Sequence, residues 1–288
     1  MTAPHPRSGV QSDRLPWTLA YTVSSDDCRT PMPLGFDAPL ADASHELAAL
    51  GYDALEVQVR DVDAHDAERV TAAISPSGLR IAAVGTGPIA AQEGLSLTDP
   101  APDVRRHALA RLRGAARLAA ALGVPLTLGQ TRGTFLPGLA DVQHTWAEQA
   151  VRQLAVDAAA LGTRLLIEPQ KRANTSVWNT PDEALAFART LGISTELVLD
   201  THHLEQEGLD AATAVGAHIK ETGCVQLADA TARGPLAVGD HRLPALFHAL
   251  RDGAFTGWLC LEHTQDGNSV LAAARSWAAV HDAAATLT

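Results

Sequence analysis

The sequence predicts a single (β/α)8 barrel, an α/β fold in which eight parallel strands alternate with eight helices around one axis. Short apolar segments alternate about eight times with segments of helical periodicity. The 288 residues suit one large domain, and no Gly/Ser or Pro linker divides them. A doubly wound sheet would carry GxGxxG after an early strand, and GTGPIA at 85–90 matches it only in part. We expect a flexible tail over residues 1–13 and one barrel domain over 14–288.

Alternating and β-branched segments predict the strands, and apolar residues spaced three and four apart predict the helices. Helix ends are marked by Gly51 and Gly123, and a capping box with proline begins at Thr180. The predicted strands are Leu15–Val23, Ala54–Val59, Leu79–Val84, Val124–Leu128, Arg164–Glu168, Glu196–Asp200, Ala217–Lys220 and Trp258–Glu262. The predicted helices are Leu40–Leu50, Ala64–Ile74, Pro100–Leu122, Val142–Leu161, Thr180–Leu191, Glu205–Ala214, Leu243–Leu250 and Ser269–Ala285.

Composition and charge limit the classes of function. Hydrophobic residues make up 46% and charged residues 19%, as in a protein with a substantial core. The formal net charge of −11, with no basic block, argues against binding to a nucleic-acid backbone. We find no signal-peptide core and no membrane-spanning segment, so we expect a cytoplasmic protein without membrane contact. The three cysteines are odd in number and widely spaced, and they match neither a disulfide framework nor a cysteine zinc site.

Four predicted strands in succession each bring a polar residue toward the same end of the barrel. RLLIEPQ ends on Glu168, LVLDTHHL on Asp200 and GWLCLEHT on Glu262, and GAHIKETG carries His218 near its end. The carboxyl ends of parallel strands converge on one mouth, so these residues are expected to share a site. Three carboxylates and one imidazole suit one divalent cation, with Mn²⁺ or Mg²⁺ preferred and Co²⁺ or Zn²⁺ as alternatives.

The motifs IEPQ, LDTHH, HIKE and LEH, in this order on eight β/α units, resemble the xylose isomerase-like TIM barrels, which include sugar-phosphate isomerases and epimerases. The resemblance implies that Glu168, Asp200, His218 and Glu262 bind the metal. It also implies a role in substrate or metal binding for His203, three residues after the aspartate, and it matches Lys220 to the family's lysine. Tagatose/psicose-type epimerases carry an arginine six residues after the metal histidine, and Cys224 stands there instead.

Three side chains are expected to contact substrate: His203, Lys220 and Arg233. His203 could instead hydrogen-bond a neighbouring carboxylate, and Lys220 could be buried with an ion-pair partner. Arg233 lies in the glycine-containing loop ARGPLAVGD, where contact with an anionic group and simple solvation are equally compatible with the sequence. Glu56 in ALEVQV could face the barrel interior, although an ordinary polar strand residue is the preferred interpretation.

These features predict a metal-dependent isomerase or epimerase of a small sugar or related hydroxycarbonyl compound, with Glu168 and Glu262 as the acid and base. A lyase of the keto-inositol or dehydroshikimate dehydratase type would need the same metal and acids. An apurinic endonuclease would need further metal ligands and a positively charged surface for DNA. A non-catalytic sugar-binding module would not need such a set of acids. The oligomeric state is left open, with a homo-oligomer among the alternatives.

Overall fold

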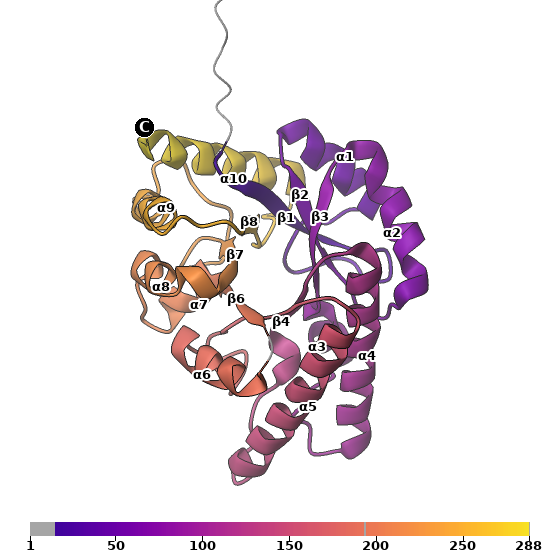
Figure 1. Ribbon diagram of the computed structural model, residues 1–288. Coiled ribbons are helices and arrows are strands. Elements are labelled where there is room, and N and C mark those ends of the chain that lie inside the picture. The colour runs from indigo at the N-terminus through magenta and orange to yellow at the C-terminus, as the bar shows by residue number, and fades with distance from the viewer. Residues whose placement is uncertain (1–14, 193, 288) are drawn as a thin grey trace, which may run out of the picture.

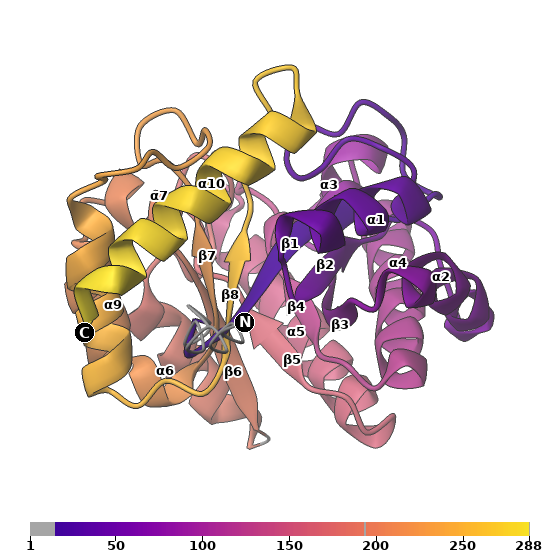
Figure 2. The same cartoon turned by 90° about the horizontal axis from the view of Figure 1, so that it is seen from above.

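The computed structural model describes residues 15–192 and 194–287, so the predicted tail at residues 1–13 lies outside the described part. The strands form a closed parallel barrel in the order β1 to β8, with β8 pairing back to β1. Figure 1 shows the helices arranged as a ring around these strands, and Figure 2 shows β1 and β8 side by side beneath α10. The strands are β1 (Thr18–Ser24), β2 (Ala54–Gln58), β3 (Arg80–Gly85), β4 (Leu126–Leu128), β5 (Leu165–Ile167), β6 (Thr195–Asp200), β7 (Thr222–Leu227) and β8 (Trp258–Leu261). The (β/α)8 prediction is confirmed.

The helices cover the outside of the barrel and use the end signals that the sequence carries. Gly51 and Gly123 adopt left-handed backbone conformations after α1 and α4, and Thr180 forms the capping box of α6 with Glu183. The helices are α1 (Leu40–Leu50), α2 (Ala67–Ile74), α3 (Gly87–Glu93), α4 (Pro102–Leu122), α5 (Ala140–Ala160), α6 (Pro181–Leu191), α7 (Thr201–Gln206), α8 (Ala211–Ala217), α9 (Arg242–Asp252) and α10 (Ser269–Ala284). No helix within the described ranges is both long enough and apolar enough to cross a bilayer.

Two sequence predictions about the region after β6 are wrong. One helix was expected over Glu205–Ala214, but two short helices, α7 and α8, lie there, because Asp200 and Asp210 each cap a helix start. Strand seven was expected at Ala217–Lys220 and instead spans Thr222–Leu227. The segment Ile219–Glu221 is a 3₁₀ turn that precedes the strand. The second error moves the side chains that β7 delivers to the mouth.

Apolar packing occurs on both faces of the barrel wall. Larger side chains fill the space between strands and helices, and a smaller cluster lies inside the barrel. The inner cluster comprises Ala20, Ala54, Ala83, Leu166, Val198, Cys224, Trp258 and Cys260. Because side chains alternate along a strand, the residue two positions beyond an inner residue also faces inward. This alternation directs Glu56, Glu168, Asp200, Gln226 and Glu262 into the upper part of the barrel.

Candidate active site at the barrel mouth

Glu168 follows β5 directly and is held by neighbours on both sides. Its backbone N–H donates to the carbonyl of Leu128 on β4 (3.1 Å), and its Oε2 accepts from Gln170 Nε2 (2.7 Å). A Cβ at Gly129 would lie 2.4 Å from this Oε2, so the glycine provides the space for the carboxyl group. The other oxygen, Oε1, is buried and has no hydrogen-bond partner among the described residues. Burial, together with nearby Glu262 and Asp200, raises the pKa of Glu168 well above its usual value.

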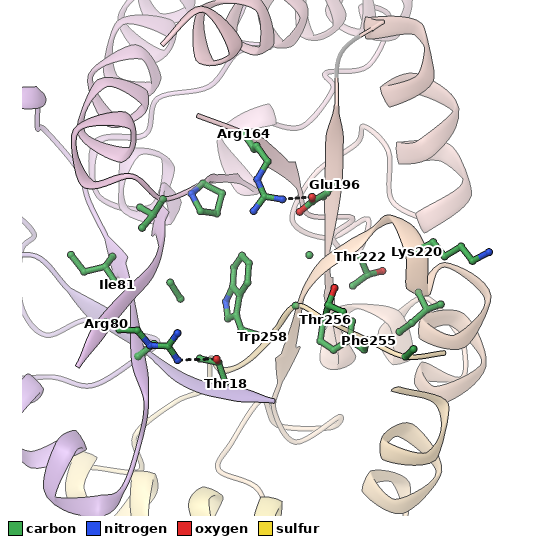
Figure 3. Close-up of a pocket in the computed structure, with 18 of the residues that line it drawn as sticks. Thr18, Arg80, Ile81, Arg164, Glu196, Lys220, Thr222, Phe255, Thr256 and Trp258 are labelled. Carbon is green, nitrogen blue, oxygen red and sulfur yellow. Dashed lines mark hydrogen bonds and ion pairs between the residues drawn. The ribbon is translucent and has the colours of Figure 1, made fainter. Parts of the chain in front are cut away.

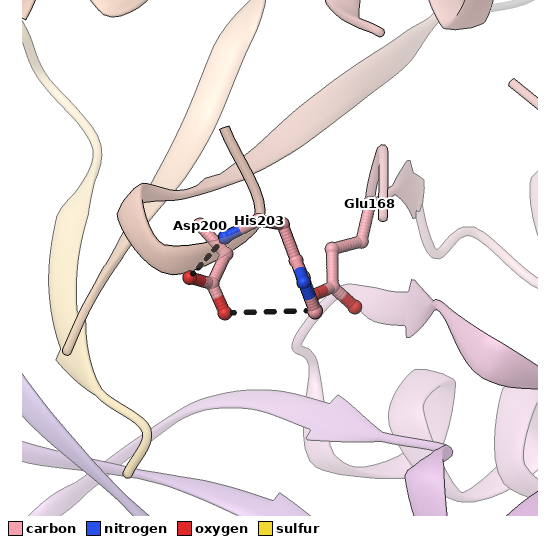
Figure 4. A group of neighbouring side chains, drawn as sticks. All are labelled: Glu168, Asp200 and His203. Atoms are coloured by element: carbon pink, nitrogen blue, oxygen red, sulfur yellow. Dashed lines mark hydrogen bonds and ion pairs between the residues drawn. The ribbon is translucent and has the colours of Figure 1, made fainter. Parts of the chain in front are cut away.

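Asp200 ends β6 and caps α7 in the same turn of chain. Its Oδ1 accepts from the backbone N–H of His202 (2.7 Å), and this turn places His203 beside the carboxylate. Figure 4 shows the His203 ring between Asp200 and Glu168, with Nε2 3.4 Å from Glu168 Oε1 and 3.9 Å from Asp200 Oδ2. Desolvation lowers the pKa of His203 to about 3, despite the opposing effect of Asp200, so the imidazole is neutral.

Arg233 reaches the mouth from the loop after β7 and joins the acids of two strands. Its Nη2 donates to Asp200 Oδ2 (2.7 Å) and to Glu262 Oε2, and its Nη1 donates to His203 Nε2 (3.0 Å). Burial alone would raise the pKa of Asp200, but Arg233, His203 and His202 together outweigh it and hold that pKa below its usual value. The pKa of Glu262 remains raised by desolvation. Arg233 is therefore part of the site.

The end of β7 presents Gln226, which the sequence analysis did not single out. Gln226 is the register partner of Asp200 on β6 and of Cys260 on β8, and its side chain is buried inside the barrel. The signal was present in the sequence, because GCVQL has the strand pattern and the glutamine shares inward parity with Cys224. It was missed because the strand was placed five residues too early. Cys224, compared above with the family's arginine position, is an inner core residue of β7.

The structure does not bring His218 to the mouth. His218 follows α8, before β7 begins, and its ring bonds to Asp182 Oδ1 (3.0 Å) and to the carbonyl of Ala214 (2.8 Å). Residues that precede a parallel strand lie at the opposite end of the barrel from residues that follow it. The placement of His218 beside Glu168, Asp200 and Glu262 was therefore wrong.

Lys220 also lies away from the mouth. It is exposed in the 3₁₀ turn before β7 and lines an open cavity of about 560 Å³ at the amino-terminal end of the strands. Figure 3 shows this cavity around Trp258, with Arg80 and Arg164 on either side and Lys220 at its edge. This cavity is remote from the acid cluster, and Lys220 cannot contact a substrate held there.

A second buried arginine, Arg132, lies in the turn after β4 and binds backbone carbonyls near the mouth. Its guanidinium donates to the carbonyls of Gly129 (3.0 Å) and Val177 (2.9 Å) and to that of Glu168. These bonds tie the chain after β4 to the chain after β5, which fixes the backbone that carries Glu168. Desolvation lowers the pKa of Arg132 to about 10, and Glu168 opposes this shift. No sequence pattern around Arg132 indicated that this arginine would be buried.

The donor set fits a divalent cation. Glu168, Asp200 and His203 each offer a ligand atom within 4.8 Å of the others. Three buried carboxylates near one Arg233 would leave two negative charges uncompensated if all were ionised. Glu168 Oε1 and Gln226 Oε1 are both buried without a hydrogen-bond partner in the described part of the chain. Buried acceptors without donors are costly, and a cation would satisfy them.

A closed parallel barrel with acids at the carboxyl ends of its strands defines this protein as a (β/α)8 barrel of the enzyme type. The family model "Xylose isomerase-like TIM barrel" matches residues 45–283, and the chain belongs to this family. A Streptomyces coelicolor protein named "Putative hydroxypyruvate isomerase" is 24% identical over 258 residues, which cover 84% of this chain and 91% of that protein.

Solved structures support the same fold. The 3-keto-D-glucoside 4-epimerase of E. coli superposes with a TM-score of 0.73 at 19% identity and covers 94% of this chain and 98% of its own. A xylose isomerase-like TIM barrel protein from Mycobacterium smegmatis, in complex with magnesium, gives a TM-score of 0.63 at 16% identity and covers 94% and 97%. At these identities the likeness shows the fold alone.

Proposed function

We propose that this protein is a divalent-metal-dependent isomerase or epimerase of a small hydroxycarbonyl compound. The observation that carries the proposal is the pair of buried acids, Glu168 and Glu262, at the ends of β5 and β8. β5 and β8 are separated by β6 and β7 in the closed barrel, so the two carboxyl groups enter its interior from different parts of the wall. This arrangement suits transfer of a proton at a carbon held between them.

Glu168, Asp200, Glu262 and the carbonyl oxygen of Gln226 would hold the cation, with His203 beside them. This set replaces the predicted one, in which His218 supplied the fourth ligand. Its oxygen-rich character favours Mg²⁺ or Mn²⁺ over softer ions. When bound, the cation would act as a Lewis acid on the substrate carbonyl and stabilise negative charge on adjacent oxygens, an effect worth several kcal/mol.

In the proposed reaction one glutamate removes a proton from the carbon next to the carbonyl, and the resulting enediolate is then reprotonated. Return of the proton to the neighbouring carbon gives isomerisation, and return to the opposite face of the same carbon gives epimerisation. Arg233 holds Asp200 and Glu262 in place through Nη2. Its Nε–H is buried and has no partner among the residues described, so it is the donor left for a substrate oxygen.

The substrate is proposed to be small. Glu168, Asp200, His203 and Glu262 are each no more than 9% exposed, which leaves little open space at the mouth. An open cavity of about 560 Å³ lies at the other end of the barrel. The similarity to a protein named as a hydroxypyruvate isomerase supports a substrate of about this size.

A substrate screen with added Mn²⁺ tests the proposal. Hydroxypyruvate, short ketoses and inososes would be incubated in D₂O and followed by NMR, which separates isomerisation, epimerisation and dehydration. We expect an isomerised or epimerised product of a short substrate with solvent deuterium on the carbon beside the carbonyl. Conversion without deuterium incorporation would indicate hydride transfer or direct return of the proton, and an alkene or enol product would indicate the lyase.

A further inference from the structure

The upper barrel contains a chain of side-chain hydrogen bonds that the proposed reaction does not use. It runs from the backbone N–H of Gly87 on α3 to Gln58 and Glu56, both on β2, and on to Gln226 on β7. Gly87 N donates to Gln58 Oε1 (3.1 Å), and Gln58 Nε2 donates to Glu56 Oε1 (3.0 Å). Gln226 Nε2 donates to the same oxygen of Glu56 (3.2 Å). All three side chains are buried.

The backbone N–H of Gly87, at one end of this series of hydrogen bonds, determines which group donates in each of them. A backbone N–H can only donate, so Gln58 must turn its carbonyl oxygen toward Gly87 and its NH₂ group toward Glu56. Glu56 Oε1 then accepts from Gln58, both when Glu56 is ionised and when it carries its proton on Oε2. In both of these forms Gln226 faces the same accepting oxygen and presents its NH₂ group to Glu56. The carbonyl oxygen of Gln226 is left facing away from Glu56.

The protein provides space for this arrangement. A Cβ at Gly85 on β3 would lie 2.2 Å from Gln58 Nε2, so only glycine at this position allows the Gln58 side chain to lie where it does. The Oε1 atom of Gln226 is buried and has no hydrogen-bond partner within the described ranges. An unsatisfied buried carbonyl oxygen is unfavourable, and its retention next to Asp200 is explained if it has a ligand that the chain itself does not supply.

We propose that Glu56 is a positioning residue, which sets the amide orientation of Gln226 so that its carbonyl oxygen, and not its NH₂ group, faces the bound cation. This inference rests on the proposed function, since it assumes that the mouth holds a metal. A cation is attracted to a carbonyl oxygen and repelled by an amide NH₂ group. The orientation of one amide therefore decides whether Gln226 is a ligand or an obstacle.

Direct measurement of Mn²⁺ affinity tests this inference without reference to catalysis. Free aqueous Mn²⁺ is titrated with metal-free protein and followed by electron paramagnetic resonance. Glu56→Leu removes the accepting oxygen, and Glu56→Asp keeps the acid but withdraws it by one methylene. We expect both variants to bind Mn²⁺ more weakly, by about 10- to 100-fold for Glu56→Leu, as for other residues that orient metal ligands.

Glu56→Gln separates orientation from charge. This variant has lost the acid but retains an accepting oxygen at the same position, so we expect Mn²⁺ affinity close to that of the wild type. Equal weakening in Glu56→Gln and Glu56→Leu would mean that Glu56 acts through its charge and would overturn the inference. Should Glu56→Leu fail to fold, the comparison of Glu56→Asp with Glu56→Gln decides the question alone.

Gln226→Glu should restore the Mn²⁺ affinity that is lost in Glu56→Leu. A glutamate at 226 offers an oxygen in either orientation, so Glu56→Leu should have little effect on Mn²⁺ binding when Gln226→Glu is also present. Wild-type affinity in Gln226→Leu would remove Gln226 from the site and overturn the inference, while the metal site of Glu168 and Asp200 would stand. A wild-type protein that binds no Mn²⁺ would instead overturn the proposed function itself. Glu196→Gln, which removes the same charge at the other end of the barrel, is the matched control.

Discussion

The two ends of this barrel carry the same kinds of charged side chain in opposite surroundings. At the mouth, Arg233 joins Asp200 and Glu262, and no member of this group has a side chain more than 12% exposed. At the amino-terminal end, Arg164 pairs with Glu196, with side chains 51% and 24% exposed around an open cavity (Figure 3). Burial removes the charges of the first group from water, which costs free energy and strengthens the interactions among them. Water screens the attraction between Arg164 and Glu196 in the second group.

The difference indicates where chemistry is placed. Buried acids have shifted pKa values and unsatisfied oxygens, which are the properties that a metal or a substrate can use. Charged residues that line an open cavity, as at the amino-terminal end, need not have these properties. An open cavity is therefore a poor guide to function in this protein, because the cavity of about 560 Å³ lies at the end without the acid cluster. The predictions below test this contrast, from the largest expected effect to the smallest.

Loss of the central arginine should cost the most stability. Arg233→Ala leaves two buried carboxylates without their cation, and we expect the free energy of unfolding to fall by about 3–5 kcal/mol in metal-free protein. Arg164→Ala, at the exposed end, should cost at most about 1 kcal/mol. Urea unfolding of both variants measures the contrast. Equal losses would show that burial does not separate the two ion pairs.

The two glutamates should dominate turnover. Glu168→Gln and Glu262→Gln keep the size and one oxygen of each side chain but remove the basic carboxylate, and each should lower kcat by at least about a hundredfold. Glu196→Gln should leave kcat unchanged, since this acid lies at the opposite end of the barrel. Near-normal turnover in both mouth variants would refute their acid/base roles even if metal binding were intact.

Glu56 should make stability depend on pH. Desolvation, with Glu262 adding to it, raises the pKa of Glu56 to about 8. An acid with a folded pKa above its unfolded value binds its proton more tightly in the folded state, so its contribution to stability is lost as pH rises toward 8. Glu56→Gln has no proton to lose at this position. The free energy of unfolding of the variant, measured relative to that of the wild type, should therefore rise by about 2 kcal/mol from pH 6 to pH 8. Urea unfolding of metal-free protein at the two pH values measures this gain, and parallel pH profiles would contradict it.

The two histidines should differ in metal binding. His203→Ala removes a neutral imidazole from the acid cluster, and we expect Mn²⁺ affinity to fall by about tenfold. His218→Ala, on the other side of β7, should leave metal content unchanged, because its ring bonds to Asp182. Metal analysis of the purified variants checks both. Loss of metal in His218→Ala would restore the earlier sequence-based assignment.

Local patterns in the sequence determined the barrel and three of its acids. Apolar segments and helix caps placed the elements nearly correctly, with β7 as the main exception, because both signals act within a few residues. Glu168, Asp200 and Glu262 could be predicted because each stands at a strand end, two positions beyond an inward-facing residue. His203 followed from its spacing after Asp200, and α7 begins at once after that aspartate.

Tertiary structure alone decided the content of β7 and the partners of the acids. AHIK and TGCVQL both have a short strand pattern, and the choice between them depends on pairing with β6, where Leu197 aligns with Thr222 and Asp200 with Gln226. Register is set by hydrogen bonds and burial between strands distant in sequence, so a local pattern cannot fix it. The same shift moved His218 and Lys220 to the far end and brought Gln226 to the mouth. The contacts of Arg233 and Glu56 likewise depend on which strands the closed barrel places across from one another, and no spacing along the chain encodes that distance.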